Sequence, residues 1–476
     1  MDDTVTGELL IGGTGVRGTA GVLYGVDPLS DTRLSPGFGI AAPDQVDAAC
    51  RLAEAAYQPF SRSPAALRAR LFDAIGAQLA ALGKALAERM GEETGMGRER
   101  IHAEQAALAE QCRQFARVLR AGHGPWEARG PGRRAVPAGP AAVFAGSHCS
   151  LACSVAGVDA MAALAAGCPV IAQTHHCYPG TAELLGRALQ AAAGELRLPP
   201  GTFALLVADA GGGSLAEHPL VRAASFACQS PDGWQLLQRA RARTDQIVIH
   251  APAWSANPAF VLPHALNSRA ENIAQRYIQQ LNDAAGQARQ RSALLVTLDS
   301  DGFIDLREGL AEAVLNTAPA PLNLAAHAAY LRGAARCMSN QDVERIAEGR
   351  EASGRWGAQA LLFEADAGAL LRNPALMNDV MGPVALLVRC TDTQQMLDAA
   401  ACLHGQLAAA VHMDDADREL GERVLGAVER TAASVTVNVY PGTADACSGH
   451  AAALAIERFV RRVCYAGQAA SAAWAR

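Results

Sequence analysis

Histidine and cysteine residues that could bind a metal or act as nucleophiles gather in one part of the chain. They form two groups, His148, Cys149 and Cys153, followed about one helix and one strand later by His175, His176 and Cys177. Imidazole nitrogens and thiolates are ligands that zinc prefers. The groups contain no CxxC pair, however, and residues four apart share a helix face by ordinary periodicity. We therefore expect buried free thiols and no metal site, with zinc binding as the alternative.

Two arginines, Arg289 and Arg291, could bind a substrate. Guanidinium groups beside a dry tunnel can hold a carboxylate or phosphate through paired hydrogen bonds, with His148 or His250 moving a proton. The alternative for the arginines is an ion pair within the loop, for example with Asp283. For His250 the alternative is a strand-end histidine whose hydrogen bond is satisfied. Both alternatives predict structural roles.

The composition narrows the class of protein. The 476 residues suffice for two or three domains with a large apolar interior, and the net charge of -6 is not concentrated in blocks. Neither nucleic acid nor a membrane is therefore an expected partner. The first 13 residues lack a secretory signal, and the longest apolar stretch, 151–172, is interrupted by Gly, Asp and Pro. We therefore expect a cytoplasmic protein, in which the twelve scattered cysteines are buried free thiols and do not form a disulfide framework.

Alternating helices and strands must position these residues. Amphipathic helices are predicted at 44–57 and 64–90 and a third helix at 98–120, before a Gly- and Pro-rich loop or irregular excursion at 122–140. Strands are then predicted at 141–145, 170–172, 203–207, 221–226 and 246–249, with helices at 150–166, 180–193 and from Ser230-Pro231. After Asn257-Pro258, strands at 259–262 and 294–298 flank a helix at 268–284. This order predicts an α/β fold, with a doubly wound parallel sheet of the nucleotide-binding kind and a second α/β domain.

Six segments carry a resemblance to a known family: GPAAVFAGS from Gly139, ALAAGCPV from Ala163, YPGTAEL from Tyr178, NPAFVLP from Asn257, MGPVALLVRC from Met381 and AIERFVRRVCY from Ala455. They resemble the aldehyde dehydrogenase superfamily, closest to its NADP-type fatty aldehyde and 2-ketoglutarate semialdehyde dehydrogenase branch. The resemblance implies a Rossmann-type dinucleotide-binding domain at 1–121 and 141–250 and a catalytic-type domain at 251–440. It also implies small oligomerisation and C-terminal elements at 122–140 and 441–476, and assembly as a homo-oligomer (dimer) or with another protein.

The resemblance places three catalytic positions, and none carries the residue that the family uses. In the family the Gly-Gln pair, here 286–287, is followed by one apolar residue and then by the nucleophilic cysteine. This chain has Arg289 at the position of that cysteine. The oxyanion-binding asparagine corresponds to His148, and the glutamate five residues before Asn257 corresponds to Pro252. A protonated guanidinium cannot attack an aldehyde, and proline has no titratable group. A neutral His148 could still donate one hydrogen bond to an oxyanion.

The cofactor positions implied by the resemblance are also altered. Gln173 stands where the family's lysine binds the adenine ribose, and it offers no charge to a 2′-phosphate. Cys228 replaces a glycine beside the pyrophosphate, before the helix that contains Gly233. Met381 replaces a stacking aromatic residue, and Asp379 is one methylene shorter than the family's glutamate. We expect no tightly bound cofactor, and weakened contacts for NAD or NADP.

These replacements predict an aldehyde dehydrogenase homologue that no longer oxidises aldehydes and instead serves in binding, assembly or regulation. One alternative is a repurposed enzyme that binds an anionic substrate through Arg289. Another is a divergent, active NAD(P)-dependent aldehyde dehydrogenase that uses a different thiol. The candidates Cys149, Cys153 and Cys228 do not stand in the Gly-Gln-x-Cys setting of the family.

Overall fold

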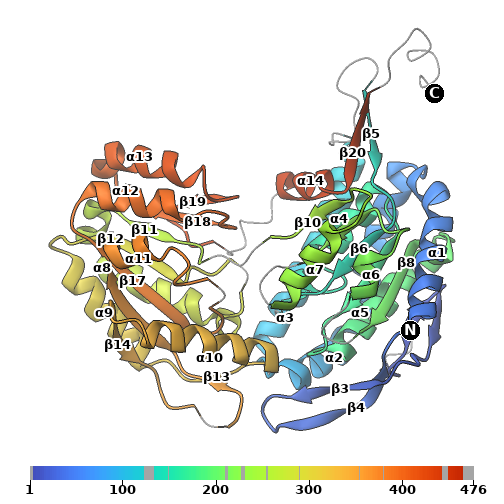
Figure 1. The fold of residues 1–476 in the computed structure, drawn as a ribbon, viewed down its shortest axis with the longest axis horizontal. Coiled ribbons are helices and arrows are strands. Elements are labelled where there is room, and N and C mark those ends of the chain that lie inside the picture. Colours follow the sequence, from blue (N-terminus) through green and yellow to red (C-terminus); the bar gives the residue numbers. More distant parts are fainter. Residues whose placement is uncertain are drawn as a thin grey trace.

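The computed structural model describes residues 4–122, 133–147, 150–208, 213–226, 231–252, 256–288, 290–352, 354–378, 380–441 and 449–464. They form two lobes, each built on a seven-stranded sheet, and a narrow two-stranded ribbon projects from the first lobe (Figure 1). Within this part of the chain, no helix is both long and apolar enough to cross a membrane.

The sheet of the first lobe is mostly parallel. In sheet order its parallel strands are β10 (Val248–His250), β9 (Ala223–Ser225), β6 (Ala141–Phe144), β7 (Val170–Thr174) and β8 (Phe203–Val207). At one edge β1 (Leu9–Ile11) pairs antiparallel with β8, and β2 (Thr14–Val16) pairs with β1. The five predicted strands are confirmed, whereas β1 and β2 were not expected.

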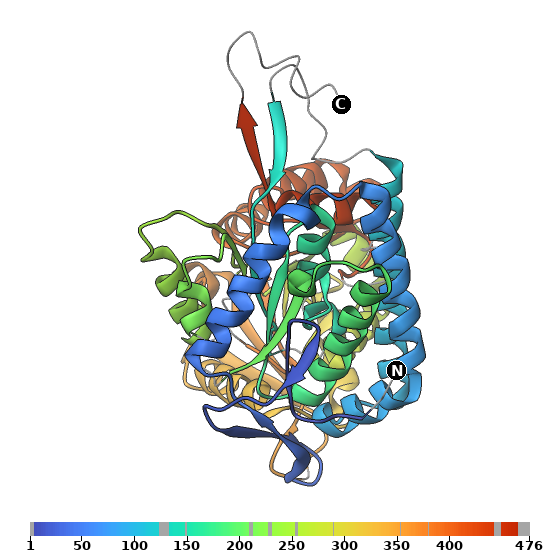
Figure 2. The ribbon, with the colours of Figure 1, turned by 90° about the vertical axis from the view of Figure 1, so that its right-hand side faces the viewer.

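Helices cover this sheet, and Figure 2 shows the long N-terminal helices running along the outside of the lobe. They are α1 (Pro43–Ser61), α2 (Ala65–Thr94), α3 (Arg98–Ala121), α4 (Val158–Ala166), α5 (Pro179–Glu195), α6 (Gly213–Glu217), α7 (Pro231–Arg241) and α14 (Gly449–Glu457), with 3-10 turns η1 (Leu151–Cys153) and η2 (Pro200–Thr202). The single helix predicted at 150–166 is wrong, because the chain turns between η1 and α4. A side chain at Gly157 would place its Cβ 2.2 Å from the carbonyl oxygen of Ala152, so this turn requires glycine.

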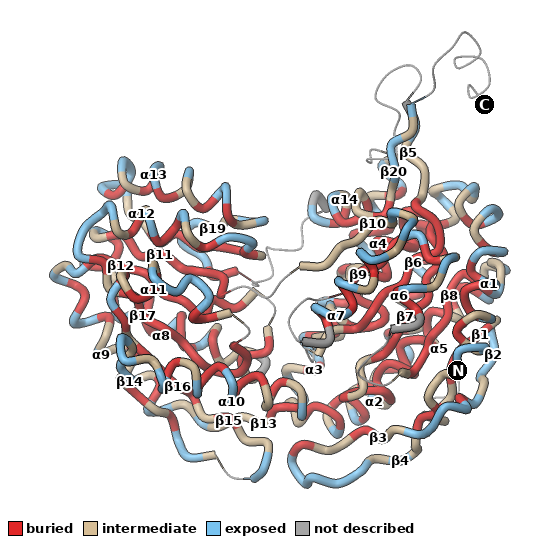
Figure 3. The backbone as a smooth tube through the Cα atoms, viewed as in Figure 1, coloured by how far each residue is buried: buried red, intermediate tan, exposed pale blue. Residues whose placement is uncertain are grey.

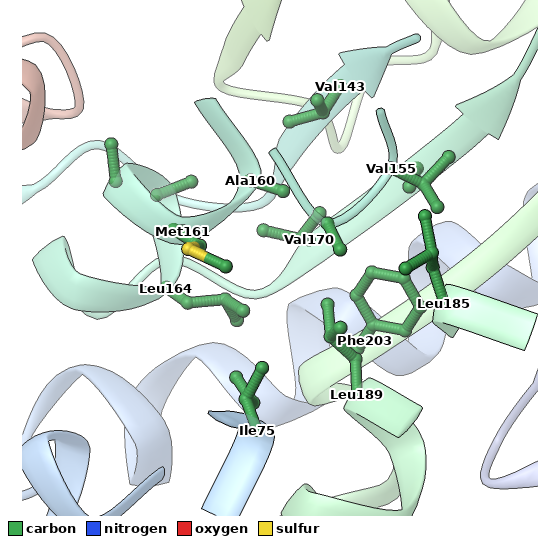
Figure 4. Close-up of a cluster of buried hydrophobic side chains, with 14 of the residues drawn as sticks. Ile75, Val143, Val155, Ala160, Met161, Leu164, Val170, Leu185, Leu189 and Phe203 are labelled. Carbon is green, nitrogen blue, oxygen red and sulfur yellow. The ribbon is translucent and has the colours of Figure 1, made fainter. Parts of the chain in front are cut away.

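Two apolar cores lie on opposite faces of the sheet. On β6, Ala141 and Val143 pack into one core, while Ala142 and Phe144 pack into the other. Figure 4 shows the larger core, where residues of the strands meet residues of α2, α4 and α5. Because both faces are covered, β6, β7 and β8 are buried along their whole length and consist almost entirely of apolar residues.

The second lobe repeats the parallel plan. Its strand order is β14 (Val343–Glu348), β16 (Leu361–Asp366), β17 (Val384–Cys390), β12 (Leu294–Leu298), β11 (Ala259–Val261), β18 (Ala409–His412) and β19 (Val435–Val437), with only β14 antiparallel to its neighbour. The helices are α8 (Pro263–Asn282), α9 (Phe303–Leu315), α10 (Leu324–Met338), α11 (Ala367–Arg372), α12 (Thr393–Cys402) and α13 (Arg418–Val428), with 3-10 turns η3 (Asp283–Gly286) and η4 (Asp415–Asp417). A second α/β domain was therefore predicted correctly.

Three small antiparallel pairs lie outside the main sheets, and two of them lie where the lobes meet. The hairpin of β3 (Val22–Asp27) and β4 (Thr32–Gly39) reaches the second lobe, where Asp31 accepts a hydrogen bond of 2.8 Å from Trp356 Nε1. Beside that contact, β13 (Ala320–Pro321) pairs with β15 (Gly357–Ala358). The hairpin therefore bridges the lobes at their lower edge, as seen in Figure 1.

The projecting ribbon is formed by β5 (Arg133–Pro137) and β20 (Val460–Cys464), which pair antiparallel. The prediction of a loop or irregular excursion at 122–140 is wrong for β5, because its partner strand lies near the other end of the sequence and local composition does not reveal it. Figure 3 shows exposed or half-buried backbone along β20, in contrast to the buried strands of both sheets. The ribbon joins the two segments in which the resemblance implied oligomerisation elements.

Candidate active site

The structure describes four of the predicted site residues, namely Pro252, Gln173, Gly233 and Met381. The other four lie outside the described residues: Arg289, His148, Cys228 and Asp379. The backbone is described to within a few residues on both sides of each of these four. The candidate site is therefore defined by the segments that lead to them.

Asn323 connects the two lobes at this site. It lies just before α10, where its Oδ1 accepts a hydrogen bond from a backbone N–H of the first turn and so caps the helix. Its Nδ2 donates to the carbonyl oxygen of Ser147, at 2.9 Å, and lies 3.4 Å from Gln287 Oε1. One buried amide thus brings together the segments that precede His148 and Arg289. Sequence reasoning missed this residue, whose signal was an asparagine before an apolar helical run.

The Gly-Gln loop is tightly packed. Gly286 has a φ of 70°, and a Cβ there would lie 2.2 Å from the carbonyl carbon of Gly382. Gln287, the next residue, is buried. Only glycine combines this left-handed conformation with such a close backbone contact. The loop leading to residue 289 is therefore fixed against the segment that contains Met381.

Arg291 holds the same loop from the other side. Its buried guanidinium donates to the carbonyl oxygens of Gly286 at 2.6 Å, Val380 at 2.6 Å and Val384 at 3.4 Å. Burial lowers the pKa of Arg291 to about 10, so the group stays protonated at neutral pH. An anion at Arg291 would have to displace these carbonyls. The predicted ion pair with Asp283 is wrong for Arg291, because Asp283 pairs with Arg100.

Pro252 follows β10, on the chain segment that crosses to the second lobe. Five residues later, buried Asn257 donates from Nδ2 to the carbonyl oxygen of Arg291, at 2.9 Å. Its Oδ1 accepts from the Ala408 N–H, at 3.0 Å. This asparagine therefore ties the crossing segment to the loop at 286–291. His250 ends β10, where its carbonyl oxygen accepts from Phe226 N, and its role in proton transfer stays a prediction.

The cofactor positions that are described lie on different lobes. Gln173 lies near the end of β7 and is 8% exposed, and its side-chain amide makes no hydrogen bond to another described residue. A ribose hydroxyl would supply a partner for this amide, as in NAD, whereas the 2′-phosphate of NADP would find no charge. Gly233 lies in α7, and Met381 packs in the apolar core beside α10.

Several of the described cysteines are buried and are poor nucleophiles. Burial raises the pKa of Cys168 and Cys337 to about 11 and that of Cys390 to about 12. A thiol with such a pKa carries almost no thiolate at neutral pH. These three residues therefore do not replace a missing nucleophile.

The profile of the Aldehyde dehydrogenase family matches residues 27–297. The chain belongs to this family. It is 36% identical to "Alpha-ketoglutaric semialdehyde dehydrogenase 2" of Azospirillum brasilense, over 97% of this chain and 94% of the relative. It is 32% identical to "Alpha-ketoglutaric semialdehyde dehydrogenase" of Acinetobacter baylyi, over 90% of this chain and 87% of the relative. These relatives confirm the resemblance inferred from the sequence.

Solved structures confirm the aldehyde dehydrogenase fold. An NAD-dependent benzaldehyde dehydrogenase from Corynebacterium glutamicum superposes with a TM-score of 0.79 and 19% identity, over 97% of this chain and 98% of that chain. A 1-pyrroline-5-carboxylate dehydrogenase from Thermus thermophilus superposes with a TM-score of 0.80 and 17% identity, over 96% of this chain and 91% of that chain. At identities of 19% and 17%, these superpositions show the fold of this aldehyde dehydrogenase family member and nothing further.

Proposed function

We propose that this aldehyde dehydrogenase family member has lost NAD(P)-dependent aldehyde oxidation and acts as a non-catalytic binding, assembly or regulatory protein. The observation that carries the proposal is the Gly286-Gln287 loop, whose packing is intact although the residue two positions later is Arg289. Arg291, Asn257 and Gly382 all fix this loop. The loop that would carry a nucleophile is kept, whereas the sequence has Arg289 at the position that corresponds to the nucleophile.

The chemistry of aldehyde oxidation supports this reading. The reaction needs a nucleophile with a lone pair, a group that stabilises the oxyanion and a base that activates water. Arg289 has no available lone pair, and Pro252 cannot accept a proton. His148 is the mildest of the three changes, because loss of one oxyanion donor reduces a rate by about 10² to 10³, and imidazole keeps one N–H.

A cofactor is not required for this role. The neutral amide of Gln173 can form a hydrogen bond with a ribose hydroxyl, but it lacks the charge of the family's lysine. We therefore expect weaker NAD binding than in the family, and NADP binding that is weaker still. We also infer that the chain assembles with itself or with another protein through the β5–β20 ribbon, and that it is cytoplasmic. Measurement of the molar mass by light scattering, with and without charge reversal at the exposed Arg462 of the ribbon, tests the inferred assembly.

An activity assay tests the main proposal. The purified chain is mixed with the semialdehyde of α-ketoglutarate, because two relatives are named for this substrate, and with short, long and aromatic aldehydes. NAD or NADP is added, and the reduced cofactor is followed by its absorbance. We expect no signal above a protein-free blank. The Azospirillum relative, assayed separately under the same conditions, should give turnover.

Three variants sharpen the interpretation. Turnover by the native chain would refute the proposal, and its loss in Arg289→Ala would identify the repurposed enzyme instead. Restoring the family residues, as Arg289→Cys combined with Pro252→Glu and His148→Asn, is expected to return measurable oxidation, because the loop around residue 289 is kept. Arg289→Cys alone is expected to react with an aldehyde but to release product slowly, since the base is missing.

A further inference from the structure

The turn that follows β7 brings two imidazoles and a thiol together. His175, His176 and Cys177 each place one ligand atom within 4.8 Å of the other two. The two imidazole rings lie 4.2 Å apart, and Tyr178 N–H donates to the carbonyl oxygen of His175 at 3.3 Å, which closes the turn. Nitrogen and sulfur donors are the set that zinc and its neighbouring transition metals bind, in preference to calcium or magnesium.

The turn is held in place by contacts on both of its sides. The hydroxyl of Tyr178 donates to the carbonyl oxygen of Gly146, and its ring stacks on that of His175 at 5.7 Å. Immediately beyond, Gly180 N and Thr181 N donate to the buried carboxylate of Glu93 at 2.7 and 2.8 Å. A site on such a preorganised segment loses little conformational entropy when an ion binds.

The His175 ring already directs a lone pair into the turn. Cys177 N–H donates to its Nδ1 at 3.3 Å, and since a backbone N–H can only donate, Nδ1 is the unprotonated nitrogen. This hydrogen bond is longer than usual, so a metal ion can replace it at small cost. Tetrahedral zinc needs donor atoms roughly 3.3 to 3.8 Å apart, so the side chains must close by about 1 Å.

We propose that His175, His176 and Cys177 bind one transition-metal ion of the zinc class, outside the residues that the aldehyde chemistry would use. Three protein ligands leave the fourth position to water or another donor. The thiol of Cys177 gives its proton to solvent as the sulfur–metal bond forms, and the imidazoles bind through lone pairs. One proton is therefore released for each ion bound.

Calorimetric titration of the full-length chain with Zn²⁺, after removal of metal with a chelator, tests the site. We expect one ion per chain, one proton released when buffers of different ionisation enthalpy are compared, and a thiolate-to-metal absorption band with Co²⁺. His176→Gln and Cys177→Ser should each weaken zinc binding at least about 100-fold. The matched variants His102→Gln and Cys464→Ser, at an exposed histidine and an exposed cysteine, should bind like the native chain.

Absence of binding by the native chain overturns the proposal, as does equal loss of affinity in the two matched variants. Thermal unfolding is recorded for every variant, and if Cys177→Ser does not fold, the half-buried His176→Gln decides the outcome. The titration contains no aldehyde and no nucleotide. The metal site and the proposed loss of oxidation can therefore fail independently.

Discussion

Arg100 of α3 and Asp283 at the end of α8 form an ion pair that joins the two lobes. The same guanidinium contacts Glu104, which is buried and accepts hydrogen bonds from Ser150 Oγ at 2.9 Å and Leu151 N at 3.0 Å. A connected set of charges and hydrogen bonds thus links the start of the Gly-Gln loop to the segment beyond β6. This network is one of the contacts that hold the two lobes together near the candidate site.

We expect the two carboxylates of this network to contribute unequally. Asp283→Asn should lower the free energy of unfolding by about 0.5 to 1 kcal/mol, because Asp283 is 42% exposed and solvent screens the pair. Glu104→Gln should lower it by about 3 kcal/mol, because it leaves a partly buried guanidinium with a weaker partner. Urea unfolding measures both, with the exposed Asp301→Asn as control. Equal effects of Asp283→Asn and Glu104→Gln would contradict this assignment.

Neighbouring glutamates provide a second matched test. Both Glu92 and Glu93 form ion pairs with Arg89, but Glu93 is fully buried and also accepts from the first residues of α5. Glu93→Gln should lower the free energy of unfolding by about 3 kcal/mol, since a buried charge loses its counter-charge. Glu92→Gln should change it by less than about 0.5 kcal/mol. Thermal unfolding of both variants checks this difference. If Glu92→Gln and Glu93→Gln lowered the melting temperature by similar amounts, this would rule out a role of Glu93 in capping α5.

His412 should make stability depend on pH. Burial, with the nearby Arg269 and Arg276, lowers the pKa of His412 from 6.5 to about 4. Between these values the unfolded chain binds a proton that the native chain does not, so stability is present above pH 6.5 and is lost as the pH falls. The loss by pH 4 is about 3 kcal/mol. His412→Phe should flatten this part of the pH profile of the free energy of unfolding.

Alanine substitutions at Gly286 and Gly405 can distinguish the cost of backbone strain from the cost of steric overlap. Both have φ near 70°, but a Cβ at Gly405 would meet no atom within 4 Å, whereas one at Gly286 would overlap Gly382. Gly405→Ala should cost about 1 kcal/mol of stability, and Gly286→Ala about 3 kcal/mol. Denaturant midpoints of the two variants check the difference. Indistinguishable midpoints would show that the loop at 286 can move away from Gly382.

The elements with a local signal were predicted from the sequence. The continuous apolar run of β8 indicates a strand buried on both faces, and Pro179 and Gly180 mark the start of α5. The pairing of β5 with β20 was not predictable, because neither segment has a local pattern that names its partner. The bridge from Asn323 to Ser147 spans 176 positions in the sequence and depends on how the lobes dock.

The last described helix and strand complete the lobe in which the chain begins. Ala452, Ile456 and Phe459 belong to the main core of the first lobe, and Phe459 accepts a backbone hydrogen bond from Ala138 at 2.8 Å. During synthesis, the first lobe therefore leaves the ribosome with part of its apolar core uncovered until the entire second lobe has been translated. The nascent chain must stay soluble through that interval, and removal of α14 is expected to weaken the core of the first lobe.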